Sequence, residues 1–298
     1  MGRGLCAQFA LVGMGVVLID HRESNVERAR ERIERAIDFL GREGLADVEP
    51  AAVLDGVAFT TDLAAGVAEA DVVLETVSEN LDTKHAVFER AVENAPEGAV
   101  LATNTSSLRV SDIAAGVPDE AHRVVGCHWW NPPYLPAPVE VVRSEATSAV
   151  MVARTAEFVE RAERDPILVE RDIPGFVWNR IQFAVLRECA HLVSEGVASV
   201  ADVDRAVRDG YARRTAVLGP FETVDLAGLE LFETIATELY PHLADESAPN
   251  ELFDERLAAG RGGVEDGAGF YEYDDPGGAT RRRDEGLAAL RRALGIEA

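Results

Sequence analysis

Apolar residues fall into two kinds of run along the chain up to about Val169. Short continuous runs such as Val16–Ile19 and Val72–Leu74 are typical of strands buried in a parallel sheet. The segment Asn25–Leu40 instead places its apolar residues at helical intervals, and Gly4–Leu11 is also expected to be a helix. Further strands are expected at Phe59–Thr60, Ala99–Leu101, Val124–Gly126 and Pro138–Val142. This alternation predicts an α/β fold with a doubly wound parallel sheet.

The pattern changes after Asp172, where Ile173-Pro174-Gly175 interrupts the apolar periodicity. Almost every later segment has helical spacing. Phe176–Glu195 is expected to form a long helix that is buried on one side and ends at Gly196. Further helices are expected over Ser199–Asp209, Phe221–Leu239 and Asn250–Ala259. We therefore predict two domains, an α/β domain over residues 1–172 and an all-α domain over residues 173–298.

Composition limits the classes of function. The 298 residues are 47% hydrophobic and 28% charged, which is typical of a globular protein. No apolar run approaches the roughly 20 residues needed to span a bilayer, and no secretory signal is visible, so a soluble cytoplasmic protein is expected. A net charge of −24 repels phosphates, so neither nucleic acid nor a membrane is an expected partner. The three cysteines are widely spaced without a C-x-x-C pair, so no metal site is expected.

Basic residues are almost entirely arginines, and Lys84 is the only lysine. With 53 acidic residues against 29 basic ones, the composition resembles proteins from organisms that keep molar salt in the cytoplasm, where the Debye length is about 3 Å or less. A bias in nucleotide composition also favours arginine over lysine. That bias does not explain the excess of acids, so salt adaptation is the preferred interpretation.

The beginning of the chain carries half of a dinucleotide-binding pattern. Gly2 and Gly4 resemble the end of a G-x-G-x-x-G turn, and Asp20 ends the next strand, where an acid binds ribose hydroxyls. The strand and glycines that normally come first are absent. Such a strand is central to a doubly wound sheet, so we expect the natural product to begin upstream, with Met1 an internal methionine. The alternative is a shortened paralogue that has lost tight dinucleotide binding.

Two polar turns follow neighbouring expected strands. Asn104–Leu108 follows one and Gly126–Pro133 follows the next, so both lie at the carboxyl edge of the sheet, where ligands bind in open α/β folds. Hydride removal from an alcohol needs a base for the hydroxyl proton, and His128 has the most suitable side chain. Glu140 is placed to fix its tautomer. A lone histidine is more often structural, and the other five histidines are interpreted that way.

Five ordered motifs together resemble the 3-hydroxyacyl-CoA dehydrogenase family. They are N-T-S-S-L at Asn104–Leu108, H-W-W-N-P at His128–Pro132 with Glu140 twelve residues after the histidine, P-G-F-V-W-N-R at Pro174–Arg180, G-P-F-E at Gly219–Glu222, and G-A-G-F-Y-E-Y at Gly267–Tyr273. The resemblance covers nearly the whole chain. It implies an N-terminal Rossmann domain, NAD as cofactor, and a helical C-terminal domain through which two copies form a homodimer.

The resemblance also implies roles in catalysis. His128 would be the catalytic base and Glu140 its orienting partner. Ser106 and Asn179 would hydrogen-bond the reacting oxygen of the substrate, and Asn131 would line the same pocket.

Matching by position implies a second set of residues for the cofactor. Gly2 belongs to the phosphate turn, and Asp20 would hold the adenosine ribose and disfavour the 2′-phosphate of NADP. Glu79 and Lys84 would lie along the nicotinamide side, and Asn104 would also contact the cofactor.

Two departures from the family pattern concern the substrate. Trp129-Trp130 replaces the usual paired phenylalanines, and Pro132-Pro133-Tyr134 with Arg213–Pro220 resembles relatives that act on free hydroxy acids, such as L-gulonate 3-dehydrogenase and carnitine dehydrogenase. In that case Arg214 would bind a carboxylate, although a structural ion pair is the alternative. The motif at Gly267–Tyr273 instead resembles the acyl-CoA branch.

These observations predict an NAD-dependent L-3-hydroxyacyl-CoA dehydrogenase of the 3-hydroxybutyryl-CoA type. Its His-Glu dyad would oxidise the 3-hydroxyl of a small-molecule substrate to a keto group. One alternative is a dehydrogenase of a free 3-hydroxy acid, of the L-gulonate or carnitine type. Another is a non-catalytic paralogue similar to lambda-crystallin, with impaired NAD binding.

Overall fold

The computed structural model describes residues 1–295, and residue contacts divide them into two compact units. The first unit contains Met1–Asn179 together with the described residues from Thr280 onward. The second unit contains Arg180–Ala279. The sequence placed a boundary at residue 172, whereas contacts place it after residue 179 and group the C-terminal helix with the first unit.

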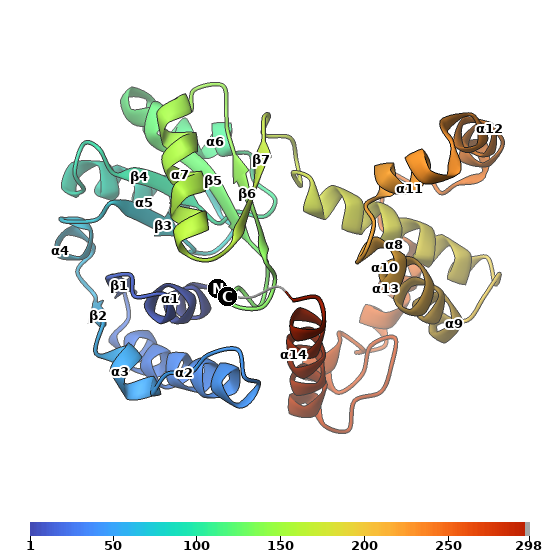
Figure 1. The fold of residues 1–298 in the computed structure, drawn as a ribbon, viewed down its shortest axis with the longest axis horizontal. Coiled ribbons are helices and arrows are strands. Elements are labelled where there is room, and N and C mark those ends of the chain that lie inside the picture. Colours follow the sequence, from blue (N-terminus) through green and yellow to red (C-terminus); the bar gives the residue numbers. More distant parts are fainter. Residues whose placement is uncertain (296–298) are drawn as a thin grey trace. The chain divides into compact units, whose positions relative to one another are not determined.

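Seven strands form the sheets of the first unit and can be followed by their labels in Figure 1. They are β1 (Val16–Ile19), β2 (Val57–Thr60), β3 (Val72–Glu75), β4 (Val100–Thr103), β5 (Val124–Trp129), β6 (Pro138–Val142) and β7 (Asp165–Val169). All pair in parallel except β5 and β6, which are antiparallel. The strands expected from the apolar runs are therefore present, and the mixed sheet confirms the expected fold class.

The strands form two sheets, a two-stranded sheet β1-β2 and a five-stranded sheet in the order β3-β4-β5-β6-β7. β1 was expected to be a buried strand, but Val17 on it is 44% exposed. The reason is that β1 pairs only with β2, so its other edge makes no strand pairing among residues 1–295. β3 likewise pairs only with β4 and is an edge strand of its sheet.

Helices cover both faces of the five-stranded sheet. Leu5 and Phe9 of α1 pack with Val159 of α7 against β4, β5 and β6 on one face. Phe88 of α5 and Ile113 of α6 belong to a separate cluster with β4, β5, β6 and β7. The helices of this unit are α1 (Gly2–Leu11), α2 (Glu23–Arg42), α3 (Pro50–Leu54), α4 (Leu63–Val67), α5 (Leu81–Asn94), α6 (Val110–Ala114), η1 (Pro118–Arg123), α7 (Ala149–Arg161) and α14 (Pro276–Ala293), the last of which begins just before the unit boundary.

The second unit is helical, as expected for the C-terminal part of the chain. Its elements are α8 (Trp178–Ser194), α9 (Val200–Arg205), η2 (Ala206–Tyr211), α10 (Ala212–Thr215), α11 (Pro220–Ala227), α12 (Leu229–Leu239), η3 (Tyr240–His242), α13 (Glu251–Ala258) and η4 (Val264–Asp266). The single helix expected over Phe221–Leu239 is two helices, because Gly228 has a φ of 99° and ends α11. No helix of the part that the structure describes is long and apolar enough to cross a membrane.

The apolar stripe of α8 is not buried as the sequence predicted. Ala190 is the one buried residue of this helix, whereas Ile181 and Phe183 are exposed. Periodicity indicates which residues share a helix face but not what packs against that face. The second unit thus leaves apolar surface uncovered within a single chain.

Candidate active site

Hydrogen bonds through Asn104 tie together the ends of β3, β4 and β5. Asn104 follows β4, and its Oδ1 accepts a bond of 2.8 Å from the backbone N–H of Trp129, the last residue of β5. The backbone N–H of Asn104 in turn donates to the carbonyl oxygen of Glu75 at the end of β3. Three neighbouring strand ends are therefore held in fixed relation at the carboxyl edge of the sheet.

His128 and Glu140 face each other directly across the antiparallel pair β5-β6. His128 Nδ1 lies 2.7 Å from Glu140 Oε2, and both side chains are buried. An ionised carboxylate can only accept a hydrogen bond, so the imidazole carries its hydrogen on Nδ1 and leaves Nε2 as the basic nitrogen. The twelve-residue spacing noted in the sequence therefore corresponds to one cross-strand contact.

The second oxygen of Glu140 accepts hydrogen bonds at the start of α8. Its Oε1 lies 2.8 Å from the backbone N of Val177 and 2.9 Å from that of Trp178. Burial alone raises the pKa of Glu140, but the bonds from His128, Trp178 and Val177 outweigh it and lower the pKa below its ordinary value. Glu140 is therefore ionised at neutral pH, and the partial positive charge of the helix N-terminus adds to its stability.

Asn179 lies in the first turn of α8 and contacts the turn that follows β4. Its Nδ2 donates a bond of 2.9 Å to the carbonyl oxygen of Ser106. The structure thus brings together two residues that are 73 positions apart in the sequence and that resemblance alone had linked. Ser106 is an exposed residue, and its hydroxyl donates a bond of 3.4 Å to Glu79 Oε1.

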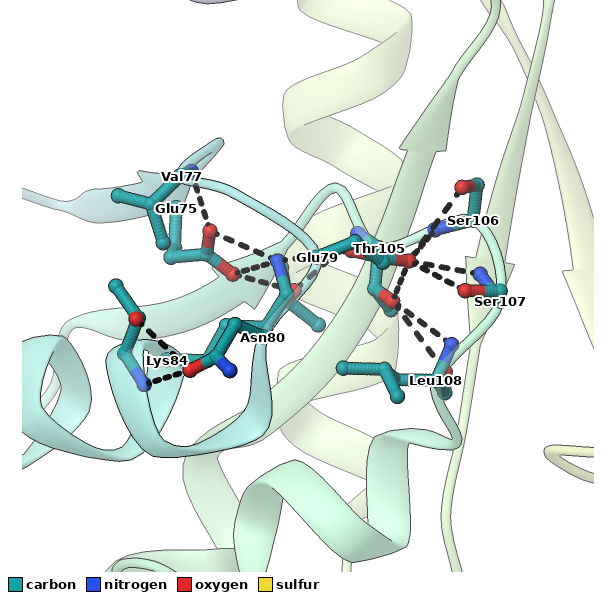
Figure 2. Close-up of polar contacts among 11 residues, drawn as sticks. Glu75, Val77, Glu79, Asn80, Lys84, Thr105, Ser106, Ser107 and Leu108 are labelled. Atoms are coloured by element: carbon teal, nitrogen blue, oxygen red, sulfur yellow. Dashed lines mark hydrogen bonds and ion pairs between the residues drawn. The ribbon is translucent and has the colours of Figure 1, made fainter.

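Glu79 organises the turn that contains Ser106, as Figure 2 shows. Its Oε1 accepts bonds from the Thr105 hydroxyl at 2.7 Å, from the Ser106 N–H at 2.8 Å, and from the Ser107 N–H and hydroxyl at 2.9 and 3.0 Å. Burial alone raises the pKa of Glu79, but these bonds and the Lys84 ammonium lower it to about 2. The carboxylate is therefore a charged anchor for the turn.

Lys84 and Glu75 form a buried ion pair beneath this turn. The Lys84 ammonium lies 3.0 and 2.9 Å from the two oxygens of Glu75 and 3.2 Å from Glu79 Oε2. Thr103 also donates to Glu75, at 2.7 Å. Sequence reasoning missed Glu75, although an acid ending an apolar strand, nine residues before the sole lysine, was a signal that could have found it.

Asn131 and Arg214, the other predicted substrate residues, are both exposed. Asn131 is exposed in the turn after β5. Beside it, Trp130 stacks on Trp178 with ring centroids 4.1 Å apart. Arg214 is exposed on α10 in the second unit, and within residues 1–295 it makes no ion pair, whereas its neighbour Arg213 pairs with Asp209 at 3.3 Å.

The expected cofactor residues Gly2 and Asp20 lie at the start of α1 and just after β1. A Cβ at Gly2 would lie 3.0 Å from the Thr76 hydroxyl, which is a tight contact. The first turn of α1 has no side-chain cap. Asp20 Oδ1 accepts from the Arg22 N–H and from Asn25 Nδ2, each at 2.9 Å. An uncapped helix N-terminus fits a phosphate, and a fixed carboxylate fits ribose hydroxyls.

Two family models match the chain over nearly its whole length. The 3-hydroxyacyl-CoA dehydrogenase NAD binding domain matches residues 1–173, and the 3-hydroxyacyl-CoA dehydrogenase C-terminal domain matches residues 175–273. The chain belongs to the 3-hydroxyacyl-CoA dehydrogenase family. This finding confirms the family resemblance, the expected NAD cofactor and the expected class of enzyme, an oxidoreductase that acts on a CH–OH group.

Individual relatives of this dehydrogenase differ in their named substrates. The 5-formyl-3-hydroxy-2-methylpyridine 4-carboxylate 5-dehydrogenase of Mesorhizobium japonicum is 33% identical over 298 residues, which cover 99% of this chain and 95% of that protein. The L-carnitine dehydrogenase of Streptomyces coelicolor is 34% identical over 303 residues, which cover 99% of this chain and 92% of that protein. A crystal structure of a dehydrogenase with the former name, described as an NAD⁺-dependent dismutase, has a TM-score of 0.92 at 31% identity and covers 100% of this chain and 96% of that one.

The ionised Glu79 gives the dehydrogenase a testable dependence on pH. A depressed pKa contributes stability that is complete above the ordinary value of 4.5 and is lost as the pH falls towards about 2. We expect Glu79→Gln to lower the free energy of unfolding at pH 7, and the difference from the wild type to shrink between pH 4.5 and 2. Urea unfolding across this range measures it, with exposed Glu93→Gln as the control. If the difference in free energy of unfolding did not change with pH, the assignment of Glu79 as an ionised anchor would be contradicted.

Proposed function

We propose that this NAD-dependent dehydrogenase oxidises the hydroxyl group of a small free carboxylic acid, with His128 as base. The observation that carries the proposal is the buried pair His128 and Glu140, 2.7 Å apart across β5-β6. This pair supplies a general base whose tautomer is fixed before substrate binds.

In the proposed mechanism, His128 Nε2 accepts the hydroxyl proton of the substrate. The imidazolium that forms is stabilised by Glu140, which already accepts the hydrogen on Nδ1. When bound, NAD supplies the hydride acceptor. Gly2 at the start of α1 would hold its phosphates, and Asp20 would hold its adenosine ribose.

Ser106 and Asn179 are proposed to hold the oxygen that loses the proton. The Asn179 side chain already donates to the Ser106 carbonyl at 2.9 Å, so the two residues are positioned together. Their hydroxyl and amide groups would orient the reacting oxygen towards His128. Asn131, in the exposed turn after β5, would line the same site.

A free acid is favoured over a thioester for two reasons. The two relatives compared above carry the names of a pyridine carboxylate and of carnitine as substrates. In addition, Arg214 has no acidic partner within residues 1–295, so its guanidinium is available to bind a carboxylate. L-gulonate and carnitine remain the model substrates for this class.

A 3-hydroxyacyl-CoA of the 3-hydroxybutyryl-CoA type is the second candidate substrate. The family models and the sequence Gly267–Tyr273 favour it. In the structure, Arg261 donates to the Gly269 carbonyl within this segment at 2.9 Å, and the Tyr271 hydroxyl donates to Asp204 at 2.6 Å. These contacts give the segment Gly267–Tyr273 a structural role, and they do not indicate that it binds CoA.

Replacing members of the dyad tests the base. We expect His128→Gln to lower kcat by about 100-fold to 10,000-fold, the usual contribution of a general base. Glu140→Gln is expected to act comparably, because Val177 and Trp178 require an acceptor and so turn the amide NH2 towards His128 Nδ1. That contact favours the wrong tautomer. NADH absorbance measures both rates, and full activity of His128→Gln would rule out the base assignment.

A substrate panel tests the chemical class. NADH formation would be followed with L-carnitine, L-gulonate, 5-formyl-3-hydroxy-2-methylpyridine 4-carboxylate and 3-hydroxybutyryl-CoA, in high salt. We expect turnover of a free acid, and Arg214→Met should raise its KM about tenfold or more, because a charge-assisted bond is lost. Arg213→Met is the matched control, since Arg213 already pairs with Asp209. Turnover of the CoA ester alone would favour the second candidate, and turnover of none would contradict both.

We also propose that the second unit forms a homodimer. Large apolar side chains are exposed on α11 and α12, including Phe221, Leu226 and Leu229. Exposed apolar patches of this kind are typical of interaction surfaces. A second copy of the chain is the occupant that the family resemblance implies.

A charged substitution on this surface tests the dimer. Leu226 is 75% exposed on α11, so Leu226→Glu should not disturb the fold of the unit. It should shift the molar mass in analytical ultracentrifugation from two chains to one, because a buried unpaired charge opposes association. Val150→Glu, at a 64% exposed position on α7, is the control and should remain dimeric. A monomeric wild type would contradict the proposal.

A further inference from the structure

From residue 280 onward helix α14 belongs to the first unit, although it lies outside both family models. The second of these models ends at residue 273, and α14 covers Pro276–Ala293. Ala288 of this helix is 0% exposed and packs in one cluster with Leu40 of α2 and with Leu135. Leu135 lies in the connection between β5 and β6. The C-terminal helix therefore contacts the segment that joins the two strands of the dyad.

We call residues 130–137, which connect β5 and β6, the dyad loop. It contains Asn131 and begins two residues after His128. Three of its eight residues are proline, which has no backbone N–H to donate. Within the loop, the Leu135 N–H donates to the carbonyl of Pro132 at 3.2 Å. The conformation of the dyad loop therefore depends strongly on donors that come from other segments.

Two buried arginines donate to the same carbonyl oxygen of the dyad loop. Arg164 Nη2 lies 3.1 Å and Arg291 Nη1 lies 2.9 Å from the backbone oxygen of Tyr134. The two arginines are 4% and 5% exposed. Arg164 directly precedes β7 and also donates to the Gln8 side chain on α1, whereas Arg291 belongs to α14. Segments from the beginning, the middle and the end of the chain thus meet at one backbone group.

The like charges of the two arginines make the position of this carbonyl important. Burial and the neighbouring Arg291 lower the pKa of Arg164 to about 9, and burial lowers the pKa of Arg291. Both guanidinium groups remain charged at neutral pH and repel each other. A carbonyl oxygen has two lone pairs, so that of Tyr134 can accept from both. Because a buried charge without an acceptor is costly, the carbonyl is held where both donors reach it.

We propose that Arg291 is a positioning residue, which through the Tyr134 carbonyl fixes the dyad loop and with it the side chain of Asn131. The C-terminal helix is then part of the machinery that orients the substrate. This inference rests on the function proposed above, in which Asn131 lines the substrate site.

The dyad loop also contacts the first turn of α1. A Cβ at Gly4 would lie 2.8 Å from Cγ of Pro133, so the loop and the helix backbone approach closely there. Packing of this kind sets a distance, whereas the hydrogen bonds from the arginines also fix a direction. Without Arg291 the loop would be free to shift along α1. Asn131, two residues before Pro133, would shift with it.

Hydrogen exchange tests the proposal independently of activity. We expect Arg291→Met to reduce the protection of the Leu135 amide about tenfold or more, because Tyr134 loses one of its two arginine donors. Arg292→Met is the matched control, since this next residue of the same helix pairs with Glu43 instead. It should leave the Leu135 amide unchanged. Arg291→Lys keeps a charged donor and should restore most of the protection. Unaltered protection in a folded Arg291→Met protein would overturn the proposal.

A second variant covers the case in which Arg291→Met does not fold. Leu287 of α14 is half-buried and packs against the cluster that contains Leu135. Leu287→Ala weakens this packing without changing a charge, so it should lower the protection of the Leu135 amide severalfold. Leu290→Ala, at a 47% exposed position of the same helix, is the control. Equal protection in Leu287→Ala and the wild type would overturn the proposed role of α14.

Kinetics test whether the dyad loop positions the substrate. Arg291→Met should lower kcat/KM about tenfold or more for whichever acid of the substrate panel is turned over, since small misplacement of a substrate-positioning group is costly. It should add no further loss in an Asn131→Ala background, because both changes act through the same group. Arg291→Lys should recover most of the activity. Losses that simply add would overturn the positioning role, and an inactive wild type would contradict the proposed function while the exchange test still stands.

Discussion

The carboxylate of Glu140 is the group on which the geometry of the site depends most. It is 0% exposed, and a buried carboxylate costs several kcal/mol unless donors surround it. The three donors come from His128 on β5 and from the N–H groups of Val177 and Trp178 at the start of α8. Satisfying one charge therefore fixes an imidazole tautomer and the start of a helix at the same time. Asn179, one residue later, is placed by the same constraint.

Glu79 is a second carboxylate whose hydrogen-bond donors are fixed in place by its charge, but these donors lie in a turn and not in the sheet. Glu140 is held within the sheet by elements that are themselves rigid, whereas Glu79 lies in the connection between β3 and α5 and holds an exposed turn. A carboxylate in a loop needs its own support, and Lys84 supplies it from the first turn of α5. Paired in this way, the charges are less sensitive to salt than exposed ion pairs are.

The sequence predicted the parts of this structure that depend on local pattern. Alternating apolar runs located the strands, and the spacing of His128 and Glu140 across two strands agreed with their direct pairing. The amides of Val177 and Trp178 were not predictable, because backbone donors look alike in any sequence. The burial of α1 and the exposure of β1 and α8 depend on which elements pack together. Glu75 was missed because its partner becomes evident only when β3 and α5 are adjacent.

Under the proposed function, the residues that carry the chemistry and the residue that binds the substrate carboxylate belong to different units. The dyad, the Ser106 turn and Asn179 belong to the first unit and depend on strand ends and on the start of α8. Arg214 belongs to the second unit, on a short helix with no buried residue. Under the proposed function, substitutions at Arg214 would change the binding of the carboxylate and leave the buried carboxylates and their donors intact. The two relatives compared above, at 33% and 34% identity to this chain, carry the names of different substrates, so overall similarity alone does not identify the substrate.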